Sequence, residues 1–196
     1  ERQALDARLR LLHAQIEPHF LFNTLANVQA LVESGSPQAA TVLASLTAYL
    51  RAAMPRFDND KATLGDELAQ VRAYLELMHL RMPDRLRFDL QVPDELKSLR
   101  FPPMALLTLV ENAIRHGIDP SEQGGTIDVG AKREPGSGTV HVWVADSGVG
   151  MSETAAPGTG LANLRSRMKA FYGESAELAL TEQAPHGLRA ELVFQA

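Results

Sequence analysis

The sequence Leu-Val-Glu-Asn-Ala-Ile-Arg-His-Gly, at positions 109–117, ends a predicted helix that spans 103–116. The earlier turns of this helix are apolar almost all round, so we expect it to be buried. Its last turns then present Glu, Asn, Arg and His, which indicates a binding site at this end. Asn112 can offer a neutral amide oxygen to a magnesium ion that bridges phosphate groups.

The same polar residues allow a simpler interpretation. A solvated helix end often carries basic side chains, and Arg115 and His116 would complement the negative end of the helix dipole. In the first interpretation both residues belong to a nucleotide site. The stretch 109–117 alone does not distinguish between these two interpretations, so the choice depends on the motifs that follow it.

A second motif, Asp-Ser-Gly-Val-Gly at 146–150, directly follows a predicted strand at 140–145. The carboxylate of Asp146 is an acceptor at the end of a strand, and it can receive the exocyclic amine of adenine. Gly148 and Gly150 allow the backbone to approach a ligand closely. The alternative is an ordinary turn.

A third motif, Gly-Thr-Gly-Leu at 158–161, leads into a predicted helix from Leu161 to Tyr172. Free amide groups and the positive end of the helix dipole favour phosphate there. Residues 151–157 would form a short lid between the two glycine motifs. Either motif alone is weak, but their order after the polar helix end predicts a nucleotide site.

The second half of the chain mixes helices with strands, which predicts a sheet covered on one face by helices. Apolar and polar residues alternate in the first of these strands, as in a half-buried strand. The strands are predicted at 86–92, 126–132, 140–145, 177–181 and 188–194.

The first half is predicted to be helical. Four apolar residues and a histidine recur at spacings of four and three, as in a helix that packs against other helices; they are Leu5, Leu9, Leu12, Ile16 and His19. A Gly-Ser-Pro break at 35–37 starts a second, antiparallel helix, with Ser36 suited to its N-cap. A capping box at 63–66 opens a third helix that ends near residue 82, and we place a domain boundary near residue 83.

A proline inside the first of these helices is the most unusual local feature. Pro18 removes a backbone hydrogen bond and crowds the carbonyl of Ala14, which costs about 3 kcal/mol and predicts a bend. A bend beside His19 would lift its imidazole towards a second domain. Imidazole suits phosphoryl acceptance because it keeps a free lone pair near neutral pH. The alternative is a histidine buried in the helical seam.

The composition excludes several classes of protein. The chain has 196 residues, 45% of them hydrophobic, which is enough for one large or two small domains. Its net charge of −5 is spread along the sequence, so we expect no direct nucleic-acid binding. It has no cysteine, which is compatible with the cytoplasm. No apolar run approaches the roughly 18 residues of a membrane span, so any membrane anchor or sensor would lie outside this chain.

These residues together resemble the LytS/YehU-type sensor histidine kinases, over about residues 11–194. Pro-His-Phe-Leu-Phe-Asn at 18–23 is similar to the phosphoacceptor box of that family, and 64–81 to the helix before its nucleotide domain. The stretch 111–113 resembles the N box of the gyrase–chaperone–histidine-kinase ATP-binding superfamily. The two glycine motifs resemble its two G boxes.

The resemblance implies an α+β chain in two parts. Residues 1–82 would form an antiparallel helical hairpin that becomes a four-helix bundle when the chain homodimerises. Residues 83–196 would form an α/β sandwich ATPase domain of the Bergerat type. It also implies autophosphorylation with ATP and Mg²⁺, followed by transfer to an aspartate of a response-regulator receiver domain, with phosphatase activity as a further option.

The resemblance also assigns roles to single residues. His19 would be the phosphoryl acceptor, Asn112 the magnesium ligand and Asp146 the reader of adenine. The remaining positions of the lid, the phosphate loop and the second G box are Gly148, Gly150, Gly158, Thr159, Gly160, Leu161, Asn163 and Arg165.

The chain departs from the family pattern beside the histidine. Glu17 stands where members often have Asn, and Phe20 stands where many other histidine kinases have an acid that orients the imidazole. We expect Glu111 to polarise His19 in its place. Asn23 lies four residues after His19 on the same helix face, where its amide could position a water, or it could be a surface amide without a chemical role.

Two other functions share the nucleotide motifs. The chain could be an ATP-binding regulatory module without kinase activity, in which His19 only packs in the bundle. It could also be a gyrase-like or chaperone-like ATPase switch, although that interpretation does not explain Pro18, His19 or the helical first half. Phosphohistidine discriminates the kinase from both.

Overall fold

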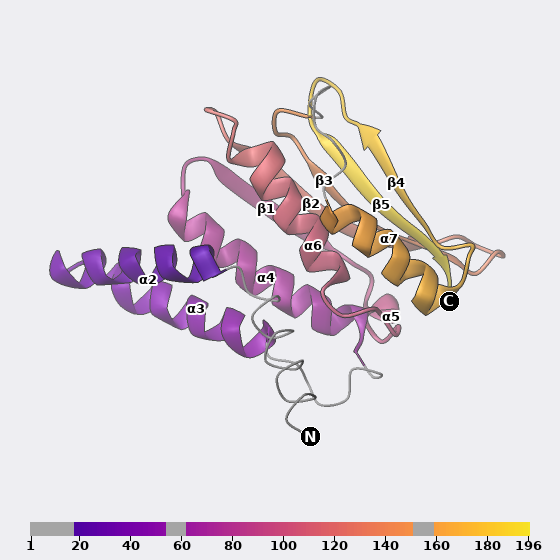
Figure 1. Ribbon diagram of the computed structural model, residues 1–196, viewed down its shortest axis with the longest axis horizontal. Helices are drawn as coiled ribbons and strands as arrows, with labels where there is room; N and C mark the ends of the chain where they lie inside the picture. Colours follow the sequence, from indigo (N-terminus) through magenta and orange to yellow (C-terminus); the bar gives the residue numbers. More distant parts are fainter. Residues whose placement is uncertain (1–17, 54–61, 151–158) are drawn as a thin grey trace.

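A computed structural model of the chain describes residues 18–53, 62–150 and 159–196. Its helical part consists of α2 (Pro18–Glu33), α3 (Gln38–Ala53) and α4 (Leu64–Arg81). Helices α2 and α3 run side by side in opposite directions, and α4 lies between them and the sheet (Figure 1). The predicted helical hairpin is therefore confirmed. The predicted bend at Pro18 depends on residues before 18, which lie outside the described ranges.

The hairpin turns where the sequence predicts it. Gly35 has a φ of 67°, in the left-handed region that glycine tolerates best after a helix end. Ser36 then accepts a hydrogen bond at its Oγ from the backbone N of Gln38 (3.3 Å), as an N-cap does. This turn brings the side chains of α2 and α3 together.

The capping box of α4 is also confirmed. Thr63 Oγ1 accepts from Asp66 N at 3.2 Å, and Asp66 Oδ2 accepts from Thr63 N at 3.1 Å. An aromatic cluster of Phe20, Tyr49 and Tyr74 joins α2, α3 and α4, with ring centroids 5.5–5.7 Å apart. Because α4 is buried along most of its length, it packs against the hairpin on one side and against the rest of the fold on the other.

The sheet has five strands in the order β1-β2-β3-β5-β4. Strand β1 pairs with β2 in parallel, and the other neighbours are antiparallel. Helices α6 and α7 lie across one face (Figure 1). The strands are β1 (Leu86–Gln91), β2 (Gly125–Arg133), β3 (Thr139–Asp146), β4 (Glu177–Glu182) and β5 (Leu188–Gln195).

The buried residues of β3 show which face of the sheet forms the core. Val140, Val142 and Val144 are buried, whereas the alternate residues His141 and Trp143 are half-buried on the other face. This period of two is the one that the sequence predicts for a sheet covered on one side. The α+β class with a layer of helices on one sheet face is therefore confirmed.

The predicted helix at 103–116 is the main correction. An α-helix, α6, spans only Ala105–Asn112, and a π-helical segment, η2 (Ala113–Ile118), continues it. Asp119 N donates to Ile114 O at 2.8 Å, which is the wider i→i+5 bond. A short helix, α5 (Asp94–Lys97), was not predicted, and α7 (Thr159–Tyr172) begins two residues earlier than expected. The boundary near residue 83 stays a prediction.

Candidate functional site

Asn112 is the last residue of α6, and its side chain is already oriented. Its Nδ2 donates to Thr108 O at 2.8 Å, one turn earlier, so the amide presents its oxygen as the remaining acceptor. The residue is half-buried. Gly160 lies beside it, because a Cβ built on Gly160 would be 4.0 Å from Asn112 Nδ2. The start of α7 and the end of α6 therefore meet, as a nucleotide site requires.

Asp146 ends β3 and is only 6% exposed. Its Oδ1 accepts from Gly148 N at 2.9 Å, so the glycine motif folds back onto its own carboxylate. Burial raises the pKa of Asp146, and the backbone N–H groups of Gly148 and Leu188 oppose that shift. A buried acceptor at a strand end suits recognition of a ligand N–H group.

Glycines bring the polar helix end and the first glycine motif into direct contact. A Cβ on Gly117 would lie 2.5 Å from Asp146 Oδ1, and a Cβ on Gly148 would lie 2.1 Å from Gly117 O. Val149 N donates to Gly117 O at 3.0 Å. No side chain fits at 117 or 148, so η2 and the strand end pack backbone to backbone. Gly117 was not among the predicted site residues, although it closes the motif at 109–117.

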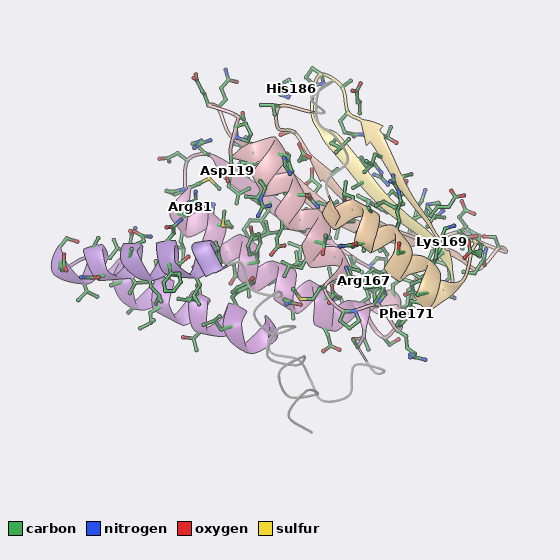
Figure 2. All side chains as sticks on the ribbon, viewed as in Figure 1. Arg81, Asp119, Arg167, Lys169, Phe171 and His186 are labelled. Carbon is green, nitrogen blue, oxygen red and sulfur yellow. The ribbon has the colours of Figure 1, made fainter. Side chains whose placement is uncertain are left out.

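The hairpin between β4 and β5 supports the same motif. His186, labelled in Figure 2, has its Nδ1 2.8 Å from Gly148 O and 3.1 Å from Ser147 O. Gly187 has a φ of 118°, and a Cβ there would lie 2.0 Å from Asp146 O. Sequence reasoning missed both residues, because a Pro-His-Gly turn between two strands carries no signal for a site that lies about forty residues earlier in the chain.

The other predicted nucleotide residues lie around this centre. Glu111 is half-buried next to Asn112, whereas Arg115 and His116 are exposed on η2. Gly150 has a φ of 79°. Along α7, Leu161 is half-buried and packs against the core, and Gly160, Asn163 and Arg165 are exposed. Thr159 begins α7 with a side chain outside the described part, and Gly158 lies outside the described residues.

The phosphoacceptor motif lies on the far side of α4 from the sheet. His19 is the second residue of α2, and its side chain is outside the described part of the structure. Phe20, which follows it, is buried against Tyr49 and Tyr74. Asn23 is exposed and lines a cavity of about 430 Å³ between α2, α3 and α4. The structure therefore brings together the nucleotide motifs but does not bring His19 to them.

The polar residues present fit a magnesium ion held mainly by a nucleotide. In the described ranges, no cluster of three or more His, Asp or Glu side chains could hold a metal by itself. Magnesium commonly takes one or two protein oxygens and leaves its other positions to phosphates and water. The amide oxygen of Asn112 has the chemistry of one such ligand. None of the described helices is both long and apolar enough to span a membrane.

The chain is similar to known proteins along most of its length. A family model described as "Histidine kinase" matches residues 7–86. The chain is 36% identical over 186 residues to a protein of Staphylococcus aureus (strain MRSA252) named "Sensor histidine kinase/phosphatase LytS". The match covers 88% of this chain and 32% of that protein. This chain thus spans about a third of the length of the curated relatives it matches.

Two solved structures share the fold. The histidine kinase domain of the Erythrobacter litoralis EL346 blue-light activated histidine kinase matches with a TM-score of 0.54 and 16% identity, covering 98% of this chain and 95% of that one. The catalytic domain of histidine kinase ThkA matches with a TM-score of 0.53 and 18% identity, covering 68% of this chain and 94% of that one. At these identities the likeness concerns the fold alone.

Proposed function

Because this chain belongs to the LytS-type histidine kinases, we propose that it transfers the γ-phosphoryl group of ATP to His19. One observation supports this proposal most. Three motifs far apart in the sequence converge, with Gly117 against Asp146 and Gly160 beside Asn112. Such a centre joins an acceptor for adenine to a ligand for magnesium and to a helix start for phosphate.

Each part of the nucleotide has a residue suited to it. Asp146 accepts the exocyclic amine of adenine, and the free amides at the start of α7, from Thr159 onward, bind phosphate. Asn112 holds Mg²⁺, which neutralises charge on the phosphates. Arg115 and His116 are exposed on η2, on the same segment, where their charge can act on the phosphates. Gly150 and Gly158 flank the segment that would cover the nucleotide.

The transfer itself exchanges one bond for another. A bond forms between an imidazole nitrogen of His19 and the γ-phosphorus, while the bond from that phosphorus to the bridging oxygen of ADP breaks. The attacking nitrogen uses its lone pair, and the other ring nitrogen carries the proton, which passes to solvent after transfer. Glu111 is the carboxylate that we propose to polarise the ring through that N–H group. Since α4 stands between α2 and the sheet, the nucleotide part must move towards His19 or serve the histidine of a second subunit.

A second subunit is part of the proposal. Large apolar side chains are exposed on the hairpin, among them Phe22 (69%) and Val32 (63%) on α2 and Leu43 (48%) on α3. Two such hairpins would cover these faces in a four-helix bundle. Residues 1–82 then act as the dimerisation and phosphoacceptor part, and residues 83–196 as the ATP-binding part.

The phosphoryl group then passes to an aspartate of a response-regulator receiver domain. The Staphylococcus aureus relative is named a kinase and phosphatase, and we extend both activities to this chain, with Asn23 positioning a water for the second. We place the chain in the cytoplasm, as the catalytic part of a longer sensor protein.

The deciding experiment uses γ-labelled ATP with Mg²⁺, on the parent chain and on His19→Gln. We expect acid-labile, alkali-stable label on the parent alone, because a phosphoramidate has that stability. Equal label on both proteins would show that His19 is not the acceptor. If ATP binds but neither this chain nor a longer one that includes the preceding residues is labelled, the regulatory module is favoured. Sustained ATP hydrolysis without phosphoprotein would favour the ATPase switch.

A further inference from the structure

Helix α6 begins without a cap of its own. Met104 occupies the N-cap position with a φ of 61°, and among the described residues its side chain makes no capping hydrogen bond. Pro102 and Pro103 precede it, and the first turn contains no acidic residue. The first amides of a helix need acceptors when they are buried. The acceptor must therefore come from elsewhere in the fold.

Glu67 of α4 supplies that acceptor. Its Oε1 accepts from Met104 N at 2.7 Å, and its Oε2 accepts from Leu106 N at 3.1 Å. Glu67 is a buried residue, only 4% exposed. One carboxylate from a neighbouring helix thus fixes both the position and the direction of the start of α6.

Arg167 of α7 completes the arrangement around Glu67. Its Nη1 donates to Pro103 O at 3.0 Å, and its positive charge acts on the Glu67 carboxylate. Arg167 is labelled in Figure 2. The helix that opens with the second glycine motif therefore also holds the residues that lead into α6.

The other end of the same segment is held from the end of α4. Arg85, four residues beyond that helix, donates from Nη2 to Ser121 O at 2.6 Å and to Asp119 O at 3.0 Å. It also reaches Ile118 O, the last residue of η2, at 3.3 Å. Arg81 lies 4.0 Å from Asp119, and both are labelled in Figure 2 where α4 meets the end of η2.

We propose that Glu67 and Arg85 are positioning residues, which clamp the segment α6–η2 at its two ends and thereby place Asn112 for magnesium and ATP. Asn112 lies between the two anchors, at the junction of α6 and η2. Helix α4 also packs on α3 and, through Tyr74, on Phe20 next to His19. A shift of α4 against the helical hairpin would therefore reach the magnesium ligand. This inference rests on the proposed function.

The test compares Glu67→Gln and Arg85→Gln with two control variants. The controls, Glu76→Gln and Arg72→Gln, change exposed residues of α4. Binding of ATP is titrated against Mg²⁺, and binding of ADP is measured separately in EDTA. We expect the Mg²⁺ concentration for half-maximal ATP binding to rise about tenfold in Glu67→Gln, the range seen when groups behind a metal ligand are lost. ADP binding in EDTA should change less than twofold, because Asp146 lies on β3. The control variants should match the parent.

Several outcomes would overturn the inference. Equal magnesium dependence in Glu67→Gln and the parent would do so, as would equal loss of ATP and ADP binding, which indicates general structural damage. If Glu67→Gln does not fold, the same magnesium titration is made on Arg85→Gln. If neither variant folds, the two residues have a purely structural role and the inference is wrong. A parent that binds ATP and labels His19 keeps the proposed function in each of these cases, whereas a parent that binds no nucleotide removes both proposals.

Discussion

Gly117 lies directly against Asp146, and a Cβ at position 117 would be 2.5 Å from the carboxylate oxygen Oδ1. The two residues belong to different predicted motifs, one at the end of a helix and the other at the end of a strand. Their contact is possible only without a side chain on the helix. It brings together the segments that carry the proposed magnesium ligand, Asn112, and the proposed adenine acceptor, Asp146.

Gly117→Ala should destabilise the protein and weaken ATP binding. An added methyl in a closed site costs typically about 1–3 kcal/mol, although the same change inside an exposed helix would stabilise. Gly160→Ala is the matched control for stability alone, because a Cβ there would lie 4.0 Å from its nearest neighbour, whereas position 160 itself belongs to the proposed phosphate site. Thermal unfolding of both variants and ATP titration of Gly117→Ala and the parent check this, and equal stability of the two variants would contradict the close contact.

Asp146→Asn should fold normally but bind ATP at least about tenfold more weakly, since a charged acceptor contributes roughly 1.5–3 kcal/mol. The pH dependence has a defined sign. Burial raises the pKa of Asp146, so acidification should weaken ATP binding at a higher pH than an ordinary aspartate would. Affinity measured across the acidic range tests this, and a profile shared by parent and variant would rule it out.

Glu67 should make the folded state less stable as the pH rises. Burial raises its pKa from 4.5 to about 7, so between these values the unfolded chain has lost a proton that the folded protein keeps. Stability then falls across that window by about 3 kcal/mol, at 1.36 kcal/mol for each pH unit. Denaturant unfolding at pH 4.5 and pH 7 should show this fall in the parent and a smaller one in Glu67→Gln. A common slope in both proteins would contradict it.

Glu111→Gln should bind ATP like the parent and lose most of its autophosphorylation. The reason is that the amide cannot polarise the His19 imidazole, whereas it leaves Asn112 and Asp146 in place. Labelling with γ-labelled ATP, normalised to bound nucleotide, measures the effect. Full autophosphorylation of this variant would remove Glu111 from the mechanism.

Asn23→Ala should reduce dephosphorylation of the response regulator more than autophosphorylation. Asn23 is exposed beside a cavity between α2, α3 and α4, so truncation should not disturb the buried aromatic cluster. The two rates are measured on the same preparation, with Asn27→Ala, another exposed residue of that cavity, as the comparison. Equal loss of both activities would indicate structural damage.

The sequence by itself determined the three helices of the first half, the five strands and the types of residue in the proposed site. The capping box at Thr63, the hairpin turn at Gly35 and the alternation in β3 are local signals, and the structure follows them because they depend on neighbours a few residues away. The order of the nucleotide motifs was likewise visible along the chain.

Only the tertiary structure decided which distant groups meet. The support of Gly148 by His186 and the capping of α6 by Glu67 both join residues whose pairing no local pattern encodes. A buried amide or carboxylate needs a partner, but any residue of suitable chemistry can supply it from any part of the chain. The folded arrangement of α4 against α6 makes that choice.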